Sequence, residues 1–350
     1  MTANTFGRHL RLTTFGESHG LAMGAVIDGF PAGVEFDVDR DLVPHLNRRR
    51  PGQSGLTTSR KESDSPEILS GVFEGRTLGT PICVVVHNRD ARSRDYDPNY
   101  YRAGHADRVW EEKFGHRDHR GGGRASGRET LCRVIGGSFA RLLLPEDLRL
   151  VAFVRQVGTH VARDLPDPLT IDAVDAHPTR CPDPAVAETI AEELRLCKEE
   201  GDSRGGVIEL QIHDAPIGLG EPVFWKLKNA LADAMMSIGA VVGVSLGDPV
   251  AAITTPGKDF HSGVSGDGPD AGISPAASGI QGGISNGEPI TLRVFFKPPS
   301  TVGSMAKEGR HDPCILPRAV PVVEAMAALV LADLHLATAS NRKFSLPFAN

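Results

Sequence analysis

Two histidines in polar, glycine-flanked segments are the strongest candidates for proton transfer in this sequence. His19 lies in the run Gly-Glu-Ser-His-Gly at residues 16–20, and His105 lies in Gly-His-Ala-Asp at residues 104–107. Histidine is the side chain whose ordinary pKa allows it to give or take a proton near neutral pH. Both are therefore treated as candidate acid-base groups.

Arginines are concentrated in two segments of the chain. Arg48, Arg49 and Arg50 follow one another at the predicted end of a helix, and a second basic region runs over residues 102–128. A basic triplet at a helix C-terminus can be a solvated end that favours the helix dipole. It can equally be a site for carboxylate or phosphate, which the planar fork of arginine binds well. Position alone leaves both interpretations open.

Three consecutive glycines, residues 121–123, lie inside the second basic region and precede a predicted helix. Such glycines let backbone amides approach an anion, and a helix N-terminus attracts negative charge. The alternative is a flexible turn ending at a serine cap, with Ser126 as the cap and Glu129 completing a capping box. Both can hold at once. No G-x-x-x-x-G-K-[ST] run is present, which excludes a Walker-type nucleotide loop.

The composition limits the classes of function. The 350 residues carry a net charge of -6, which argues against general nucleic-acid binding, so any anion site must be local. The first ten residues lack the apolar stretch of a secretory signal, and no apolar segment is expected to reach membrane-spanning length. The five cysteines are scattered without a C-x-x-C pair, and His116 and His119 lack further ligands, so no disulfide framework or metal site is predicted. A cytoplasmic protein is expected.

Short apolar or alternating runs predict strands, and longer runs with helical periodicity predict helices. This mixture indicates an α+β protein, and we expect one domain over residues 1–350 because no linker or repeat is evident. Glycine, serine, proline and charge predict three loops. The predicted strands are 23–30, 81–87, 150–157, 207–212, 241–246 and 290–296, the helices are 128–144, 184–199, 222–238 and 320–336, and the loops are 50–65, 117–127 and 256–287.

Three long motifs resemble those of the chorismate synthase family. The first is the run at 16–20 followed by Val-Ile-Asp-Gly-Phe-Pro at 26–31, the second is Gly-Gly-Gly-Arg at 121–124 with Ser-Gly-Arg at 126–128, and the third is Arg-His-Asp-Pro-Cys at 310–314 leading to Glu-Ala-Met at 324–326. Together with Arg-Arg-Arg-Pro-Gly at 48–52, the resemblance covers nearly the whole chain.

This resemblance implies the last step of the shikimate pathway, which serves aromatic amino acid biosynthesis. The family eliminates phosphate from 5-enolpyruvylshikimate 3-phosphate in an anti-1,4 sense to give chorismate, and it requires reduced FMN although no net redox change occurs. NADPH is implied at most as a reductant. The family fold is a sandwich with helices between antiparallel sheets, and its usual assembly is a homotetramer. No nucleic-acid or membrane partner is implied.

The resemblance also implies roles for individual residues. His19 would assist the departing phosphate as an acid, His105 would protonate or stabilise the reduced flavin, and Asp312 would relay a proton. Ser18, Arg49, Arg128 and Arg310 would bind the substrate. Flavin contacts would come from Arg124, Ala125, Ser126, Gly239, Ala240, Gly282, Lys297, Pro298, Pro299, Ser300, Thr301 and again Arg310.

Some positions depart from the usual pattern of the family. They are Gly55, Pro275, Ala276, Ser278 and a short connection over residues 297–310. The three candidate proton carriers, His19, His105 and Asp312, are unchanged. We therefore expect the reaction to be retained, with altered closure of the site or altered affinity for its ligands. The first alternative is a non-catalytic flavin-binding or phosphate-binding relative. An NAD-dependent dehydrogenase ranks last, because the sequence lacks a strand-glycine-helix fingerprint with a later acidic residue.

Overall fold

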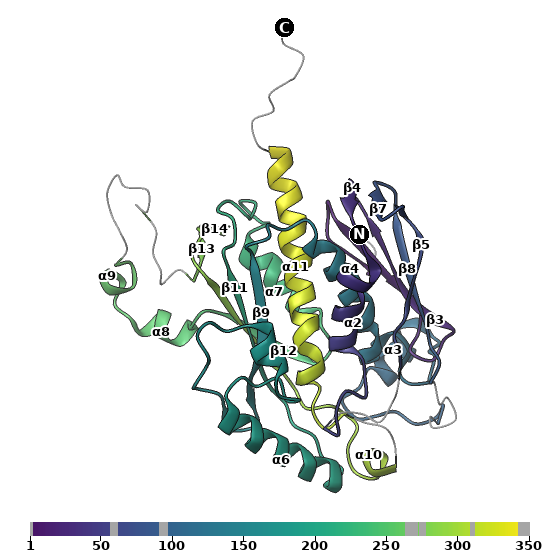
Figure 1. The fold of residues 1–350 in the computed structure, drawn as a ribbon. Coiled ribbons are helices and arrows are strands. Elements are labelled where there is room, and N and C mark those ends of the chain that lie inside the picture. Colours follow the sequence, from purple (N-terminus) through teal and green to yellow (C-terminus); the bar gives the residue numbers. More distant parts are fainter. Residues whose placement is uncertain are drawn as a thin grey trace.

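Two five-stranded antiparallel sheets enclose a layer of helices (Figure 1). The computed structural model describes residues 3–56, 62–90, 97–262, 272, 278–308 and 312–341. Buried apolar side chains from both sheets and from the helices between them form one continuous core. The predicted α+β sandwich with helices between antiparallel sheets is therefore confirmed.

The first sheet is built from the N-terminal quarter of the chain. Its strand order is β1-β2-β3-β8-β5, and every neighbouring pair is antiparallel. In β8 every second side chain is buried, as expected for a sheet with one face on the core. The bounds are β1 (Thr5–Phe6), β2 (Arg11–Phe15), β3 (Ala22–Asp28), β5 (Pro66–Ser70) and β8 (Ile82–His87).

The second sheet is built from the rest of the chain. Its order is β10-β9-β11-β15-β12, again antiparallel throughout. Five consecutive residues of β9 are buried, which fits a strand that is covered on both faces. The bounds are β9 (Arg149–Val157), β10 (His160–Val161), β11 (Gly206–His213), β12 (Val241–Leu246) and β15 (Ile290–Phe296).

Two helices, α4 (Thr130–Arg141) and α11 (Leu316–Asn341), form the centre of the helical layer. α4 contacts β2 and β3 of the first sheet, α11 contacts β9 and β11 of the second, and the two helices contact each other. Adjacent glycines of α4 permit this close packing. A Cβ on Gly136 would lie 2.7 Å from Leu12 Cδ2, and one on Gly137 would lie 2.4 Å from Ala325 Cβ. The two helices therefore meet almost backbone to backbone.

The remaining elements surround this core. Two short 3-10 helices, η2 and η3, precede α4 and belong to the candidate site. The bounds are α1 (Val38–Asp41), α2 (Val43–Arg49), α3 (Asp107–Phe114), η2 (Gly123–Ala125), η3 (Gly127–Glu129), α5 (Ile171–Asp175), α6 (Pro184–Glu200), α7 (Leu227–Met236), α8 (Pro249–Thr254), α9 (Gly257–Phe260), α10 (Ser304–Glu308), and the short strands β4 (Ala32–Glu35), β6 (Val72–Phe73), β7 (Arg76–Leu78), β13 (Ile280–Gln281) and β14 (Ile284–Ser285).

The six predicted strands and four predicted helices all correspond to observed elements, with two corrections. The predicted helix over 222–238 begins only at Leu227, because Glu221 and Trp225 pair as an isolated β-bridge. The predicted loop over 256–287 contains α9 and the β13–β14 hairpin. Gly282 and Gly283 form the turn of that hairpin, so here the glycines mark a tight turn between two strands and not an irregular loop.

Helix α11 corrects a further expectation. Residues 316–340 are long and apolar enough to cross a membrane by length and composition, although the sequence was expected to hold no such segment. In the structure 83% of the most apolar 18-residue window is buried inside the protein. It lies against α4, α7 and β9, so its hydrophobicity is that of a central core helix.

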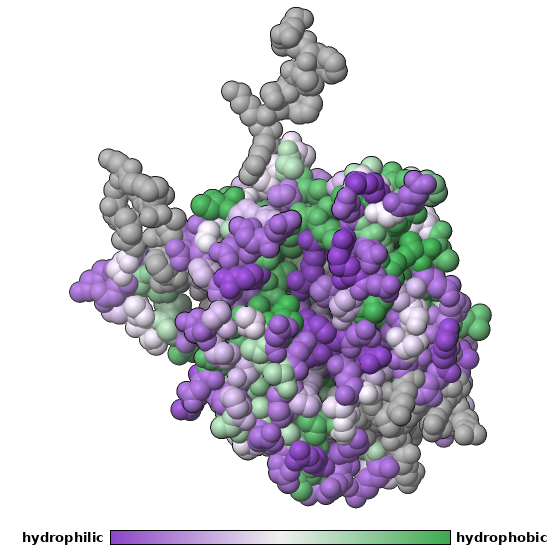
Figure 2. Space-filling view, in the orientation of Figure 1, coloured by the Kyte–Doolittle hydropathy of each residue, from purple (hydrophilic) through white to green (hydrophobic). Residues whose placement is uncertain are grey.

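Apolar side chains also reach the surface beside the first sheet. Leu69, Phe73 and Leu78 are 62%, 63% and 50% exposed, respectively. They belong to β5, β6 and β7. Hydrophobic surface is visible at the upper right of Figure 2, where Figure 1 places β5 and β7.

Replacing Gly137 by alanine should destabilise the fold. The new Cβ would lie 2.5 Å from Ala325 Cα as well as 2.4 Å from its Cβ, so the helix backbones must separate. Overpacking of this kind costs about 1–3 kcal/mol, which exceeds the gain in helix propensity. Gly243→Ala is the control, because its Cβ would lie 3.6 Å from the Phe295 ring. Equal urea midpoints for the two variants would contradict this account of the packing.

Candidate active site

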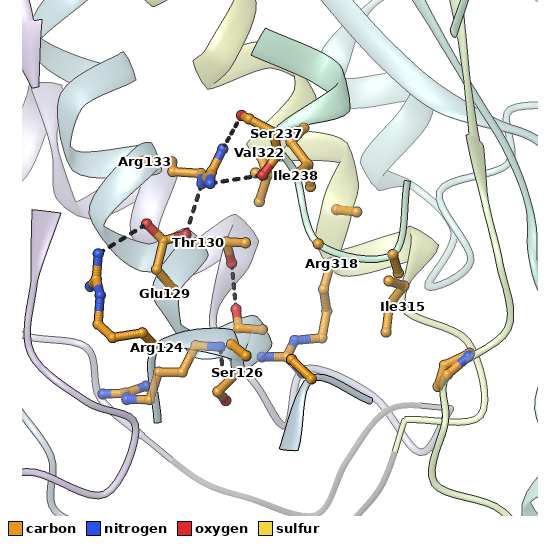
Figure 3. A pocket seen from close by; sticks show the side chains of 18 of the residues that line it. Arg124, Ser126, Glu129, Thr130, Arg133, Ser237, Ile238, Ile315, Arg318 and Val322 are labelled. Carbon is orange, nitrogen blue, oxygen red and sulfur yellow. Dashed lines mark hydrogen bonds and ion pairs between the residues drawn. The ribbon is translucent and has the colours of Figure 1, made fainter. Parts of the chain in front are cut away.

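A cavity of about 780 Å³ lies where the first turns of α4 and α11 meet. Its volume is typical of a small-ligand site. Figure 3 shows Arg124, Glu129 and Arg133 on one side of it, and Ser237 and Arg318 across from them. The N-terminal ends of the two central helices both line this space, and helix N-termini favour negative charge.

The cavity is strongly cationic although the chain as a whole is acidic. Seven cationic side chains and two carboxylates, Glu129 and Asp312, belong to its lining. Bringing so many cations together is unfavourable unless anions neutralise them. The cavity is thus suited to ligands with several negative charges. The cations are Arg49, Arg102, Arg124, Arg128, Arg133, Lys297 and Arg318.

The glycine turn at 121–123 packs directly against both candidate histidines. A Cβ on Gly121 would lie 2.6 Å from His19 Nε2, and one on Gly122 would lie 2.8 Å from His105 Cε1. All three glycines have positive φ values, which favour glycine. The turn thus lets its backbone lie against the two rings. As predicted, it precedes a helical segment, since η3 is capped by Ser126 and continues into α4 at Thr130.

The loop that carries His19 is held from both sides. Asn88 Nδ2 donates to the carbonyls of Glu17 at 3.1 Å and Gly20 at 2.9 Å. Ser18 is fully buried, and its hydroxyl donates to the Arg120 carbonyl at 3.5 Å. Ser18 is not among the residues that line the cavity; it connects the histidine loop to the glycine turn. His19 itself lines the cavity and is 8% exposed.

His105 lies between a carboxylate and an arginine. Its Nδ1 is 2.9 Å from Asp107 Oδ1 and 3.1 Å from Arg102 Nη2. Burial and the charge of Arg102 lower the pKa of His105, and Asp107 opposes this shift. Burial alone would raise the pKa of Asp107, but hydrogen bonds from Arg102 and the charge of His105 lower it to about 2. His105 is therefore neutral and Asp107 ionised at neutral pH.

Arg49 and Arg128 share one buried carboxylate, that of Asp64. Arg49 Nη1 is 3.3 Å from Asp64 Oδ2, and Arg128 Nη1 is 3.0 Å from Oδ1. Burial and the nearby cations Arg318 and Arg128 lower the pKa of Arg49. Arg128 Nη2 is buried without a hydrogen-bond partner. The carboxylate of Glu62, which is also buried, lies 4.0 Å from this nitrogen, so two carboxylates compensate the charges of Arg49 and Arg128.

Arg124 binds the first sheet. Its Nη2 donates to Thr14 Oγ1 at 2.6 Å, and its Nη1 donates to the Gly16 carbonyl at 3.2 Å. Ser126 accepts a bond from the Arg128 amide at 3.4 Å and so caps η3. The predicted capping box is wrong, because the Glu129 carboxylate accepts hydrogen bonds from Thr14 and Arg133, and the Ser126 amide donates to the Gly123 carbonyl.

Asp312 lines the cavity at the start of α11, where Arg318 donates to its carboxylate. Arg318 has a second unusual feature, since its Nε is buried without a hydrogen-bond partner. The charge of Arg318 also acts on Arg49. Asp312 is therefore fixed beside a partly satisfied guanidinium, at the edge of the cationic cluster.

Most of the residues predicted to contact flavin line this cavity. The structure brings together Arg124, Ala125, Ser126, Gly239, Ala240, Lys297, Pro298, Pro299, Ser300 and Thr301. Gly282 does not line it, because it lies in the turn of the β13–β14 hairpin. Arg310 lies outside the described residues.

The three arginines at 48–50 have different surroundings. Arg49 faces the cavity, whereas Arg48 binds Asp175 at 2.6 Å and Glu324 at 2.5 Å. Arg50 is exposed. Of the three arginines, only Arg50 therefore fits the interpretation of a solvated helix end.

Comparison with known proteins agrees with this arrangement. A family model described as chorismate synthase matches residues 10–336. The chorismate synthase of Bdellovibrio bacteriovorus is 47% identical over 351 residues, which cover 98% of this chain and 100% of that protein. The chorismate synthase of Synechocystis sp. is also 47% identical, over 95% of this chain and 97% of that protein. A crystal structure of a chorismate synthase superposes with a TM-score of 0.76 at 31% identity, covering 95% of this chain and 93% of the other.

The chain belongs to the chorismate synthase family. The resemblance seen in its motifs is thereby confirmed, and the chain is classed as a lyase with that family.

Sequence reasoning missed three charged residues around the chorismate synthase cavity. Arg133 forms an i,i+4 pair with Glu129, a spacing that could have pointed to it. Arg318 precedes the predicted helix over 320–336, and no motif includes it; in the structure it lies in the first turn of α11. Asp64 lies in a predicted loop, and nothing in its sequence context indicates that two arginines converge on it.

Two of the departures from the family pattern lie in described residues. Ser278 has a φ of 52°, a value that favours glycine, so the glycine common there in the family has a backbone reason. The Gly55 carbonyl accepts a bond from Lys198 Nζ at 2.8 Å, and Gly55 does not line the cavity. Pro275 and Ala276 lie outside the described residues.

Asp64→Asn should destabilise the protein strongly. It removes the buried charge that compensates Arg49 and Arg128, and breaking such a pair costs about 3 kcal/mol or more. Asp28→Asn is the matched control, because the Asp28 pair with Arg11 is solvent-exposed and such pairs contribute about 1 kcal/mol or less. Urea unfolding of both variants measures the difference. Equal losses of unfolding free energy in Asp64→Asn and Asp28→Asn would show that Asp64 does not stabilise the two arginines.

The pKa of His105 should respond oppositely to its two neighbours. Asp107→Asn removes the charge that raises it, so the pKa should fall further, whereas Arg102→Gln removes a charge that lowers it, so the pKa should rise. NMR titration of labelled histidine, assigned with His105→Gln, measures both shifts. Shifts of the same sign would contradict the described geometry.

Proposed function

We propose that this chain converts 5-enolpyruvylshikimate 3-phosphate to chorismate by anti-1,4-elimination of phosphate, with reduced FMN as cofactor. The observation that supports this most is the cationic cavity of an acidic protein, which seven cations and both candidate histidines line. The substrate carries two carboxylates and a phosphate, and FMN adds another phosphate. One cavity of about 780 Å³ is large enough for ligands of this kind.

Arg49 and Arg128 are the proposed substrate arginines, together with Arg310. The shared Asp64 fixes the orientation of the first two, and their positive charges favour a carboxylate or phosphate in the cavity. Both guanidinium groups belong to the lining of the cavity, which supports an anion at this place. Because both arginines are buried, their charges interact more strongly with the leaving phosphate than exposed charges would.

His19 is the proposed acid for the leaving group. In the elimination one carbon–oxygen bond to phosphate breaks, one ring carbon loses a proton, and the electrons of that C–H bond end in the new double-bond system. The phosphate oxygen that leaves gains negative charge, which a proton or hydrogen bond from His19 stabilises. The close packing of Gly121 against its Nε2 keeps the ring from rotating away.

The flavin would be held by Arg124 to Ser126, by Gly239 and Ala240, and by residues 297–301. Gly239 supports this because a Cβ there would meet no atom within 4 Å, which leaves the backbone open to a flat ring. When bound, reduced FMN supplies the electron density that assists loss of phosphate and is regenerated in each turnover. NADPH is proposed only as a reductant.

His105 and Asp312 are the proposed proton carriers on the flavin side. His105 is neutral and anchored at Nδ1 by Asp107, so its Nε2 is free to hold or pass a proton toward the cavity. Asp312 is held by Arg318, which keeps the carboxylate oriented toward the same space. The proton transfers assigned to His105 and Asp312 involve no net oxidation or reduction.

We further propose a cytoplasmic homotetramer. The exposed apolar side chains of Leu69, Phe73 and Leu78 beside the edge strand β5 support assembly with other copies.

The direct test is anaerobic turnover with chemically reduced FMN. Equimolar release of phosphate and chorismate is expected, and oxidised FMN alone should give none. A second assay with oxidised FMN and NADPH asks whether the protein reduces its own flavin. A chain that binds FMN and substrate but releases no phosphate would be a binding relative, which would overturn the proposal.

Asp312→Asn should slow turnover while ligand binding persists. Asparagine keeps the size of the side chain but cannot take up a proton, so the loss should appear in kcat more than in KM.

His19→Ala should lower kcat about 10²- to 10⁴-fold. Melting curves are measured beside the rates. Wild-type kcat with a lowered melting temperature would assign these residues a structural role only.

A further inference from the structure

Arg133 connects the two halves of the cavity wall. Its Nε donates to Glu129 Oε2 at 2.8 Å, its Nη1 to Ser237 Oγ at 2.7 Å, and its Nη2 to the Ser237 carbonyl at 3.0 Å. Figure 3 shows these bonds across the upper part of the cavity. Each nitrogen of the guanidinium therefore already donates to a protein acceptor.

The bonds of Arg133 continue to both sheets. On one side Glu129 Oε1 accepts from Thr14 Oγ1 of β2 at 3.1 Å. On the other side Ser237 ends α7 and begins the turn to Ala240, whose carbonyl accepts from the Lys297 amide at 2.9 Å. Lys297 directly follows β15 of the second sheet. Arg133 is thus the central member of a chain of bonds from the first sheet to the second.

The turn that Arg133 holds needs such support. Ala240 has a φ of 69°, a left-handed conformation that is unfavourable for a residue with a Cβ. Gly239 has open space in front of it. A strained, open turn at a cavity wall keeps its shape only if neighbouring bonds fix it.

We infer that Arg133 is a positioning residue for the flavin, which fixes the Ser237–Ala240 turn as the wall against which the ring binds. This inference rests on the proposed function, since it takes FMN as the ligand of that wall. Arg133 acts through the turn and not through the substrate arginines, because its three nitrogens are bound to Glu129 and Ser237.

The test compares Arg133→Lys with Arg141→Lys. Lysine keeps the charge but cannot make the three planar bonds of the guanidinium. Arg141 is the matched control, because it lies on the same helix and binds a buried carboxylate, Glu324, at 3.3 Å, yet does not line the cavity. Both changes lower stability, but only the first should disturb the turn.

Two measurements separate the outcomes. Without ligands, amide hydrogen exchange over residues 237–241 should be faster in Arg133→Lys than in wild type and unchanged in Arg141→Lys. With 5-enolpyruvylshikimate 3-phosphate present, the dissociation constant for oxidised FMN should rise about tenfold in Arg133→Lys, because the turn that the ring contacts is no longer held in its binding conformation. The affinity for the substrate alone should stay within about twofold, because the substrate arginines are unchanged.

Three results would contradict the inference. They are unchanged exchange over the turn, wild-type FMN affinity in Arg133→Lys, or equal loss of FMN and substrate affinity in both variants. A wild-type protein that binds no FMN would instead contradict the proposed function, and the exchange experiment would then still show whether Arg133 fixes the turn.

Discussion

The close contact of α4 with α11 is the constraint on which the site depends. Because Gly137 leaves no side chain between the two helices, their first turns meet at one place and carry Arg133 and Arg318 to the same cavity. A wider separation would place these cations on opposite sides of an open groove. The same contact positions η3, which precedes α4 and supplies Arg128. Packing in the core and charge at the site are thus set by one interhelical distance.

Concentrating cations in this way requires nearby carboxylates that hold the guanidinium groups but leave an excess of positive charge in the cavity. Asp64 does this for Arg49 and Arg128, Glu129 for Arg133, and Asp312 for Arg318. Asp64 lies behind the lining, whereas the other two carboxylates reach it. The cluster keeps an excess of positive charge facing the cavity, which is the property that a substrate and a cofactor with several negative charges need.

Local sequence patterns predicted the elements well because strands and helices follow from short-range periodicity. The six strands and the central helix of alanine and leucine were evident from this alone. The motif resemblance supplied the candidate site. Of its seventeen members within the described residues, fifteen line the cavity, the exceptions being Ser18 and Gly282, and Arg310 lies outside the described residues. Patterning could not show that the glycines at 121–123 make room for two histidine rings, because His19 and His105 lie in separate segments that only the folded chain brings to the glycine turn. Asp64 was missed for the same reason.

Glu129 illustrates where a local rule gave the wrong partner. Its position three residues after Ser126 satisfies the capping-box pattern, yet Thr14 and Arg133 provide stronger, charge-assisted partners in the folded chain. Tertiary contacts therefore replaced the local bond.

The most direct measurement of the central claim is a crystal structure with 5-enolpyruvylshikimate 3-phosphate and oxidised FMN bound together. The account predicts both ligands in the single cavity between α4 and α11, with an anionic group of the substrate on Arg49 and Arg128 and the flavin ring against Gly239 and Ala240. Density for either ligand at a different place, with the guanidinium groups of Arg49 and Arg128 left without an anion, would contradict it.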